Sequence, residues 1–314
     1  MLNVAKRWCL IPALCGTFTW AADRQEAVQS MVENENACTA LGDFYWEIGD
    51  ANGVLASGKS RRYGRIDANT KLSIASASKW VFTAYAAQRQ GGMLSASQIQ
   101  ALELRSGYNQ LNPVLCVVRS TPESCFLAGN NSKLDETAIN RFDYNGGHMQ
   151  KLMLDLGLGS YHVRDLSADL QANLGGHIDI EYGTPQAASG MKASAASYGE
   201  FLRRVLRHQL AIGNMLGANP VCTLPRSCPD ALHSPAAPRA LHYSIGHWIE
   251  DDTLGDGAFS SAGAFGFYPW ITADKQYYGI ISRLDNNPRH RTPHAGFNSV
   301  NCGMLMRKAF AGGS

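Results

Sequence analysis

The sequence has little charge of either sign and no apolar run long enough to span a membrane. Charged residues make up 17% of its 314 residues, and the formal net charge is +2. Both excess positive charges, Lys6 and Arg7, precede the first acidic residue, Asp23, so the chain without residues 1–21 is neutral. A neutral protein lacks the positive field that attracts nucleic acids and anionic membranes. We therefore exclude nucleic acids and anionic membranes as main partners. After residue 21, no stretch approaches the roughly 20 apolar residues of a transmembrane helix.

Metal-binding patterns are also missing. The chain contains no C-x-x-C and no H-E-x-x-H. His290 and His294 are four residues apart, but Pro288 and Pro293 argue against a helix that presents both. We expect neither a metal site nor a cofactor.

The N-terminus has the pattern of an export signal. Lys6 and Arg7 form a basic start, and the mostly apolar residues 8–20 are too few to cross a bilayer. Thr19-Trp20-Ala21 offers a cleavage site with small residues. The pattern predicts a signal peptide over 1–21 and a periplasmic or secreted mature protein. The alternative is a buried N-terminal helix.

Cysteine usage agrees with export. Six cysteines remain after residue 21, and an even number in an oxidising compartment indicates disulfides. Short loops that contain turn-forming residues favour two of the pairs, and the third follows by elimination. The expected pairs are Cys116–Cys125, Cys222–Cys228 and Cys38–Cys302.

Strand-like runs lie at both ends of the chain and helical patterns lie between them. We expect two strands in 43–57 around the turn Asp50–Gly53, and three more in 241–249, 264–271 and 276–284. The expected helices are 24–39, 78–90 (ending at Gly91-Gly92), 190–207 and 298–311, and the expected long loop is 213–239. This order predicts an α/β domain from residues 22–78 and 235–314, with a mostly helical domain, 79–234, inserted between them.

One candidate nucleophile stands at the start of the apolar helix. Ser76-Ala77-Ser78-Lys79 fits S-x-x-K, and residues three apart share a helix face. A buried lysine with a lowered pKa can act as the base for a serine. The motif alone is weak, because Ser76 could be a helix cap and because Ser189–Lys192 is a second copy, in a glycine-rich lead-in.

Four segments together resemble the serine β-lactamase and penicillin-binding protein superfamily, most closely its class C-like branch of esterases and peptidases. They are Leu72–Lys79, Ala101–Tyr108, Phe142–His148 and Ser260–Phe267. They occur in the order of that family and extend over nearly the whole mature chain. The resemblance implies an antiparallel sheet flanked by helices, with the helical insertion described above.

The resemblance also implies a set of roles. Ser76 would be the nucleophile, Lys79 its base, and Tyr144 the proton shuttle, with a pKa lowered by the charge of Lys79. The backbone N–H groups of Ser76 and Ala264 would form the oxyanion hole. The remaining substrate-binding candidates are Asn145, Ser261 and Gly263.

Two of these segments depart from the family pattern. Tyr144-Asn145-Gly146 has no Asn two residues after the Tyr. Asn145 can replace that amide, or Asp143 can hold the shuttle position in a shifted alignment; we favour Tyr144.

The third segment, Ser261-Ala262-Gly263, lacks the cation of Lys-Thr-Gly. Its absence counts against a dedicated β-lactamase or D,D-peptidase and favours an uncharged substrate, unless Arg226 or Arg283 supplies the charge.

The sequence therefore predicts an exported serine hydrolase that works through an acyl-enzyme on a small-molecule ester or amide, or on a peptide. A β-lactamase or D-alanyl-D-alanine carboxypeptidase is the alternative among enzymes. A catalytically silent periplasmic binding or sensor protein of the same fold is the alternative outside them. His148 and His247 are interpreted as structural residues near the cleft.

Overall fold

The computed structural model describes residues 12–61, 63–285 and 294–312. Among these residues, the main layer is an eight-stranded antiparallel sheet. The longer strands lie toward one edge, where Tyr45–Gly49 and Tyr278–Ser282 pair along five residues, and the four strands at the other edge have two residues each. In spatial order the strands are β2 (Val54–Lys59), β1 (Tyr45–Gly49), β13 (Tyr278–Ser282), β12 (Tyr268–Ile271), β11 (Phe259–Ser260), β10 (Trp248–Ile249), β9 (His242–Tyr243) and β7 (Val221–Cys222).

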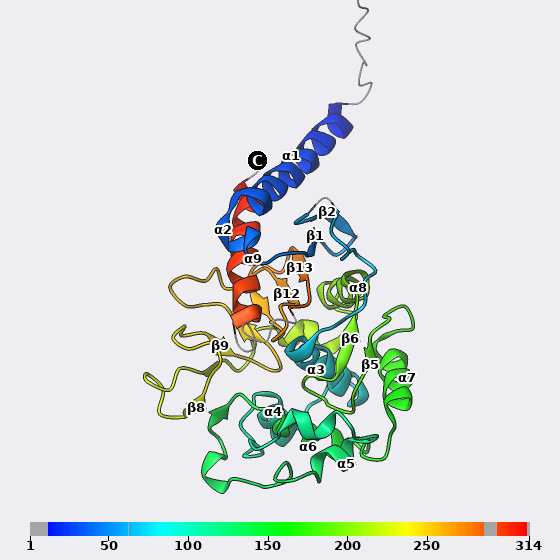
Figure 1. The fold of residues 1–314 in the computed structure, drawn as a ribbon, viewed down its shortest axis with the longest axis vertical. Coiled ribbons are helices and arrows are strands. Elements are labelled where there is room, and N and C mark those ends of the chain that lie inside the picture. The colour runs from blue at the N-terminus through cyan, green and yellow to red at the C-terminus, as the bar shows by residue number, and fades with distance from the viewer. Residues whose placement is uncertain (1–11, 62, 286–293, 313–314) are drawn as a thin grey trace, which may run out of the picture.

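Helices cover both faces of this sheet. On one face α1 (Pro12–Asn34), α2 (Asn36–Thr39) and α9 (His294–Gly312) lie together, as Figure 1 shows at the top of the molecule. Gly303 lets α9 approach the sheet closely, because a Cβ there would lie 2.4 Å from the ring of Tyr268. On the other face, α8 (Ala195–Leu206) packs against β1 and β13.

The middle of the chain forms a mostly helical region beside the sheet. Its central helix is α3 (Ser78–Arg89), which is buried from Ser78 to Ala87. The other helices are α4 (Ala96–Leu102), α5 (Pro122–Phe126), α6 (Gly147–Asp155) and α7 (Val163–Leu174), with 3-10 turns at Ala75–Ala77, Pro113–Cys116, Glu136–Ala138 and Ala211–Met215. Two small sheets complete it: β3 (Leu72–Ser73), β6 (Met191–Ala193) and β5 (Glu181–Tyr182) are antiparallel, and β4 (Phe142–Asp143) is parallel to β8 (Ala231–His233).

Several predicted elements are confirmed. The turn Asp50–Gly53 joins β1 to β2, and the amide of Asp50 donates to the carbonyl of Gly53 over 2.9 Å. Helix α3 ends where Gly91 and Gly92 adopt positive φ angles of +60° and +84°. The predicted α/β class with helices on an antiparallel sheet is likewise confirmed.

Other element predictions are wrong in detail. The run 241–249 is a hairpin, β9 and β10, because Gly246 turns the chain with a φ of +76°. The run 264–271 is a strand only from Tyr268, because a turn closed by the amide of Gly263 on the carbonyl of Phe267 (2.7 Å) precedes it. The run 190–207 begins as strand β6, and Ser194 then caps α8 by accepting from the amide of Ser197.

The three predicted cysteine pairs are all joined. They are Cys38–Cys302, which ties α2 to α9, Cys116–Cys125 and Cys222–Cys228. Residues 1–11 of the predicted signal peptide lie outside the described residues, and residues 12–21 belong to α1. Export therefore remains a prediction. Among the described helices, none has the length and apolarity to cross a bilayer.

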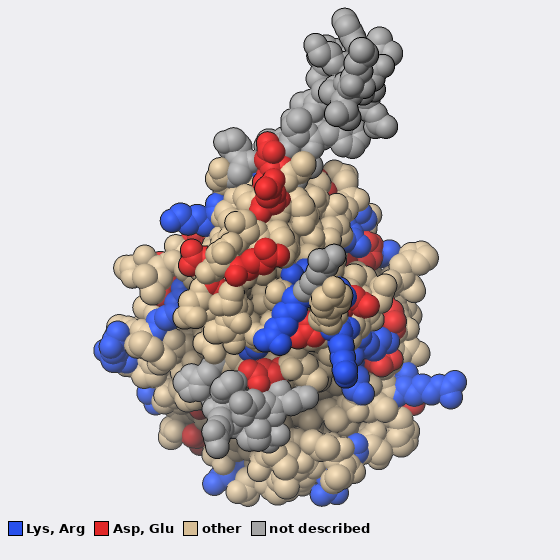
Figure 2. All heavy atoms as spheres, turned by 45° about the horizontal axis from the view of Figure 1, so that its top comes forward, with Lys and Arg blue, Asp and Glu red and all other residues tan. Residues whose placement is uncertain are grey.

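Charges of both signs are spread over the face shown in Figure 2. Blue and red side chains alternate there over a mostly uncharged surface. This distribution agrees with the near-zero net charge of the sequence.

Candidate active site

The segment before Ser76 is held against two strands. Strand β3 pairs with β6, and the amide of Ile74 donates to the carbonyl of Met191 over 3.1 Å. Ala75 then adopts a φ of +43°, which is rare for a residue with a side chain. This sharp turn ends the strand and places Ser76 just before the first turn of α3.

The third predicted segment packs directly on this turn. A Cβ on Gly263 would lie 2.3 Å from the carbonyl oxygen of Ile74, so only glycine fits there. The hydroxyl of Ser261 donates to the carbonyl of Ser76 over 3.1 Å. Ser261 thus contacts the segment around Ser76 through its side chain, while Gly263 and Ala264 line the smaller cavity described below.

Lys79 lies beside Ser76 with its charge poorly solvated. Its Nζ is 3.1 Å from the Oγ of Ser76 and 3.2 Å from the carbonyl oxygen of Ala188. Only 3% of Lys79 is exposed. Burial disfavours the charged amine and lowers the pKa of Lys79 from 10.5 to about 7. A substantial fraction of the amine is therefore neutral near pH 7 and able to accept a proton.

Tyr144 completes the group of side chains around Ser76. Its ring stacks on Trp248 with centroids 5.2 Å apart, and the Nζ of Lys79 lies 4.6 Å from the ring centre. Burial raises the pKa of Tyr144, and hydrogen bonds with Ser76 and Trp248 oppose this only in part. The expectation of a lowered pKa for Tyr144 is therefore wrong, because desolvation outweighs the hydrogen bonds that favour the charged form. Tyr144 is a protonated phenol at neutral pH.

Asp143, the alternative shuttle residue, points elsewhere. One carboxylate oxygen of Asp143 accepts from the side-chain Nδ2 of Asn109 over 2.8 Å, and the other lies 3.8 Å from the Nδ1 of His233. Burial raises the pKa of Asp143. The structure brings Tyr144, and not Asp143, together with Ser76 in the walls of the cavities described next.

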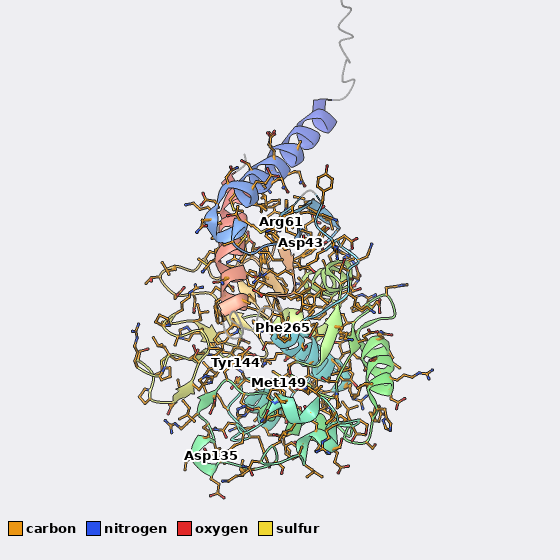
Figure 3. The ribbon with its side chains drawn as sticks, in the orientation of Figure 1. Asp43, Arg61, Asp135, Tyr144, Met149 and Phe265 are labelled. Carbon is orange, nitrogen blue, oxygen red and sulfur yellow. A yellow bond between two sulfur atoms is a disulfide. The ribbon has the colours of Figure 1, made fainter. Side chains whose placement is uncertain are left out.

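Two cavities meet at Ser76, Tyr144 and Ala264. The larger has a volume of about 700 Å³ and the smaller about 220 Å³. Figure 3 shows Tyr144 and Phe265 at the centre of the molecule, between the sheet and the helical region, and Phe265 lines the larger cavity. A molecule bound across Ser76 would thus have separate space on either side of this residue.

Two backbone donors are available at this meeting point. Ser76 and Ala264 line both cavities, and neither backbone N–H donates to another of the described residues. Such a pair of N–H groups can bind a developing oxyanion.

Asn145 shapes the larger cavity through its amide. It accepts from the amides of Leu111 and Gly147, over 3.1 and 2.8 Å, and donates to the carbonyl of Leu111 over 3.3 Å. The bonds to Leu111 fix the start of the segment after Leu111, in which Pro113, Val114 and Val117 form an apolar wall of the larger cavity. Val114 and Val117 are 72% and 60% exposed, so this wall is also a rim.

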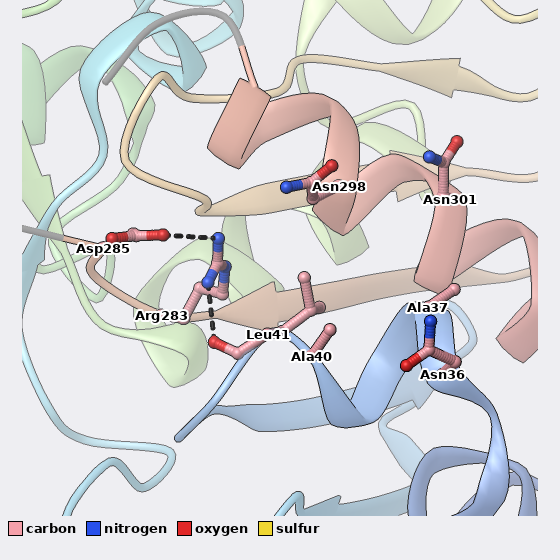
Figure 4. Close-up of a pocket in the computed structure, with 8 residues that line it drawn as sticks. All are labelled: Asn36, Ala37, Ala40, Leu41, Arg283, Asp285, Asn298 and Asn301. Carbon is pink, nitrogen blue, oxygen red and sulfur yellow. Dashed lines mark hydrogen bonds and ion pairs between the residues drawn. The ribbon is translucent and has the colours of Figure 1, made fainter. Parts of the chain in front are cut away.

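The two arginines that could replace the missing cation of the third segment form hydrogen bonds away from Ser76. Arg283 donates to the carbonyl of Leu41 and to Asp285, in the wall of a separate cavity of about 230 Å³ (Figure 4). Arg226 donates to the carbonyl of Pro238. Neither lines a cavity that contains Ser76.

His148 and His247 are both buried and hydrogen-bonded. The Nδ1 of His148 lies 2.9 Å from the hydroxyl of Ser106, and burial lowers its pKa to about 3. His247 stacks on Trp80 and accepts from the amide of Gly217, and burial lowers its pKa to about 4. Neither lines the cavities at Ser76, which agrees with the structural interpretation. No group of three or more potential metal ligands lies together in the described parts of the chain.

Sequence reasoning missed part of the site. Phe265, Gln186 and Lys192 line the larger cavity, and His233 lines the smaller. The second S-x-x-K, Ser189–Lys192, was the one sequence signal that pointed to Lys192.

Comparison with known proteins finds relatives by structure alone. No family model and no curated protein matches the sequence at a significant level. Among solved structures, the D-amino acid amidase of Ochrobactrum anthropi is similar with a TM-score of 0.68 and 11% identity, covering 92% of this chain and 99% of that one. A mutant simvastatin synthase of Aspergillus terreus is similar with a TM-score of 0.61 and 13% identity, covering 99% of both chains. A β-lactamase of Mycobacterium bovis has a TM-score of 0.52 and 13% identity, covering 86% of this chain and 96% of that one.

These likenesses define the class of fold. The protein has the fold of the serine β-lactamases and transpeptidases, as the four sequence segments implied. At this level of identity the likeness establishes the fold and leaves the substrate open.

Proposed function

We propose that the protein is a serine hydrolase that cleaves a carboxylic ester or amide through an acyl-enzyme on Ser76. The observation that supports this most directly is the buried amine of Lys79, 3.1 Å from the Ser76 hydroxyl and with a pKa of about 7. A solvated lysine would be almost entirely protonated at neutral pH and could not accept the proton of the hydroxyl.

The acylation step follows from this arrangement. Neutral Lys79 takes the proton of Ser76 as the Oγ attacks the substrate carbonyl. The N–H groups of Ser76 and Ala264 bind the oxygen that becomes negative. Tyr144 gives its phenolic proton to the leaving group and recovers a proton from Lys79, so the amine is neutral again.

Deacylation uses the same groups in reverse. A water takes the place of the leaving group, and Lys79, directly or through Tyr144, accepts its proton as the water attacks the acyl carbon. Ser76 leaves with a proton and the acid is released. The step needs no cofactor.

The walls of the larger cavity indicate the kind of group that is bound. Leu111, Pro113, Val114 and Val117 form an apolar wall that suits an alkyl or aryl group of several carbon atoms. Hydrolysis of an amide is supported by fold neighbours named as amidases. The disulfides support export to the periplasm or beyond.

Two alternatives are less well supported. A β-lactamase or D-alanyl-D-alanine carboxypeptidase is expected to have a cation in the third segment. In this chain Ser261 stands in the place of that cation, and its hydroxyl donates to the Ser76 carbonyl. A silent binding protein would have no need to bury an amine without a counter-ion, because burial of the charge destabilises the fold.

A fluorophosphonate probe tests the proposal. We expect one probe per chain, attached to the peptide that contains Ser76, and no labelling of Ser76→Ala. Ser97→Ala, which changes an exposed serine on α4, is the matched control and should be labelled fully. Wild-type protein that takes up no probe and hydrolyses no p-nitrophenyl ester would contradict the proposal.

A further inference from the structure

The second S-x-x-K segment lies in the wall of the same cavity as the first. Lys192 is the middle residue of β6, where the flanking Met191 and Ala193 are buried and Lys192 is exposed. Ser73, three residues before the nucleophile, is its partner in the strand register. The side chain of Lys192 thus belongs to the cavity side of a strand that is fixed to the nucleophile segment.

The absence of a side chain at Gly183 leaves room for the side chain of Lys192. A Cβ on Gly183 would lie 2.8 Å from the Cε of Lys192 and 3.4 Å from its Cδ. The lysine stem therefore lies across Gly183, and both residues line the larger cavity. Packing of the stem on this backbone limits the directions in which the amine can point.

The charges around this cavity have one sign. Among the described residues that line it, Lys79 and Lys192 are the charged ones, and none is an aspartate or glutamate. Lys79 is buried and engaged with Ser76. Glu181 stands opposite Lys192 in the register of β5 and β6, but its carboxylate lies 3.3 Å from Lys71. Within the described part of the chain, Lys192 has no carboxylate within 4 Å.

We infer that Lys192 is a specificity residue that binds a carboxylate of the substrate, while an apolar part of the same substrate contacts the wall around Val117. An ammonium group and a carboxylate form a charge-assisted hydrogen bond, and an unpaired amine in a mainly apolar cavity favours a ligand that supplies the opposite charge. This inference rests on the proposed function and changes one expectation from the sequence: the preferred ester or amide is an anion, although the third segment has no cation.

Matched esters with and without a carboxylate test the inference. Because the carboxylate can belong to the leaving group or to the acyl group, two pairs are needed. The first pair is 3-acetoxybenzoate and its methyl ester. The second is the monophenyl ester of adipic acid and phenyl hexanoate. For each pair the quantity measured is the ratio of kcat/KM for the anionic ester to that for the neutral one.

Lys192→Gln should lower this ratio about three- to tenfold in at least one pair, the size expected for an exposed charge pair. Lys192→Arg should retain most of it, and Lys133→Gln, which changes an exposed lysine away from both cavities, should leave it unchanged. In 1 M NaCl, where the Debye length is about 3 Å, the wild-type ratio should fall toward that of Lys192→Gln. A merely structural role of Lys192 would not produce this salt dependence.

Different results would contradict the hydrolase proposal and the role of Lys192. If wild type and Lys192→Gln hydrolyse the neutral esters equally and show the same ratios in both pairs, the role of Lys192 is wrong and the hydrolase proposal stands. If the wild type hydrolyses none of the four esters and takes up no fluorophosphonate, the hydrolase proposal is wrong and the role of Lys192 falls with it.

Discussion

Lys79→Met should abolish activity and at the same time stabilise the protein at neutral pH. Methionine keeps a flexible chain of similar shape but removes the amine that we propose as the acceptor of the Ser76 proton. Loss of a general base typically lowers kcat by about 10²- to 10⁴-fold. The amine also costs stability, because the folded protein holds it in a place where its charge is disfavoured.

The size of the stabilisation follows from the pKa. A fall from 10.5 in the unfolded chain to about 7 in the folded one corresponds to about 5 kcal/mol, at about 1.4 kcal/mol for each pH unit. Lys79→Met also leaves the carbonyl of Ala188 without its donor, which costs about 1–3 kcal/mol. We expect the free energy of unfolding at pH 7 to rise by about 2–4 kcal/mol.

The pH dependence separates this effect from ordinary repacking. Below pH 7 the lysine is protonated in both states, and above about 10.5 it is neutral in both. Between these limits the unfolded chain binds more protons, so the stability of the wild type rises with pH. In urea denaturation from pH 6 to pH 10, the advantage of Lys79→Met should be constant up to about pH 7 and then shrink as the pH rises.

Ser76→Ala is the matched control for this series. It removes the nucleophile but keeps the buried amine, so its stability should follow the wild-type pH dependence although it is inactive. An advantage of Lys79→Met that stays constant from pH 7 to pH 10 would refute the lowered pKa, and with it the role of Lys79 as the base.

Three further predictions concern the walls of the site. Tyr144→Phe should lower kcat about 100-fold for an alkyl ester and much less for a p-nitrophenyl ester, whose leaving group needs no proton; equal losses for both would contradict the shuttle role. Val117→Asp should lower kcat/KM for p-nitrophenyl hexanoate about tenfold relative to p-nitrophenyl acetate, since the longer chain loses apolar contact; an unchanged ratio would exclude this wall as its binding site. The double variant Cys116→Ser with Cys125→Ser should lose about 2–3 kcal/mol of stability in thermal unfolding, and an unchanged Tm would show that this disulfide does not support the fold.

The proximity of Ser76 and Lys79 was predictable because the two residues are close in the sequence. Ser76 and Lys79 are three residues apart at the start of a helix, so their spacing in the sequence already places them together. The disulfide pairs were predictable for a similar reason, since two of them close short loops and the third follows by elimination.

Lys192 was not predictable, because its place depends on pairing between distant segments. Strand β6 joins β3 across more than a hundred residues, and the sequence alone gave this stretch a helical pattern. The orientation of Ser261 toward the Ser76 carbonyl also depends on tertiary packing. The pKa of Tyr144 was predicted with the wrong sign because burial by Trp248 and Tyr243 cannot be inferred from residues 142–148.

The most direct test of the account is to trap the acyl-enzyme. Mixing the protein with excess p-nitrophenyl hexanoate, quenching in acid within milliseconds to seconds, and analysing the digest by mass spectrometry should show a hexanoyl group on the peptide that contains Ser76. The adduct should accumulate further in Tyr144→Phe if deacylation is slowed, and it should be absent from Ser76→Ala. A hexanoyl group on another residue, or turnover of the ester by Ser76→Ala at the wild-type rate, would contradict the central claim.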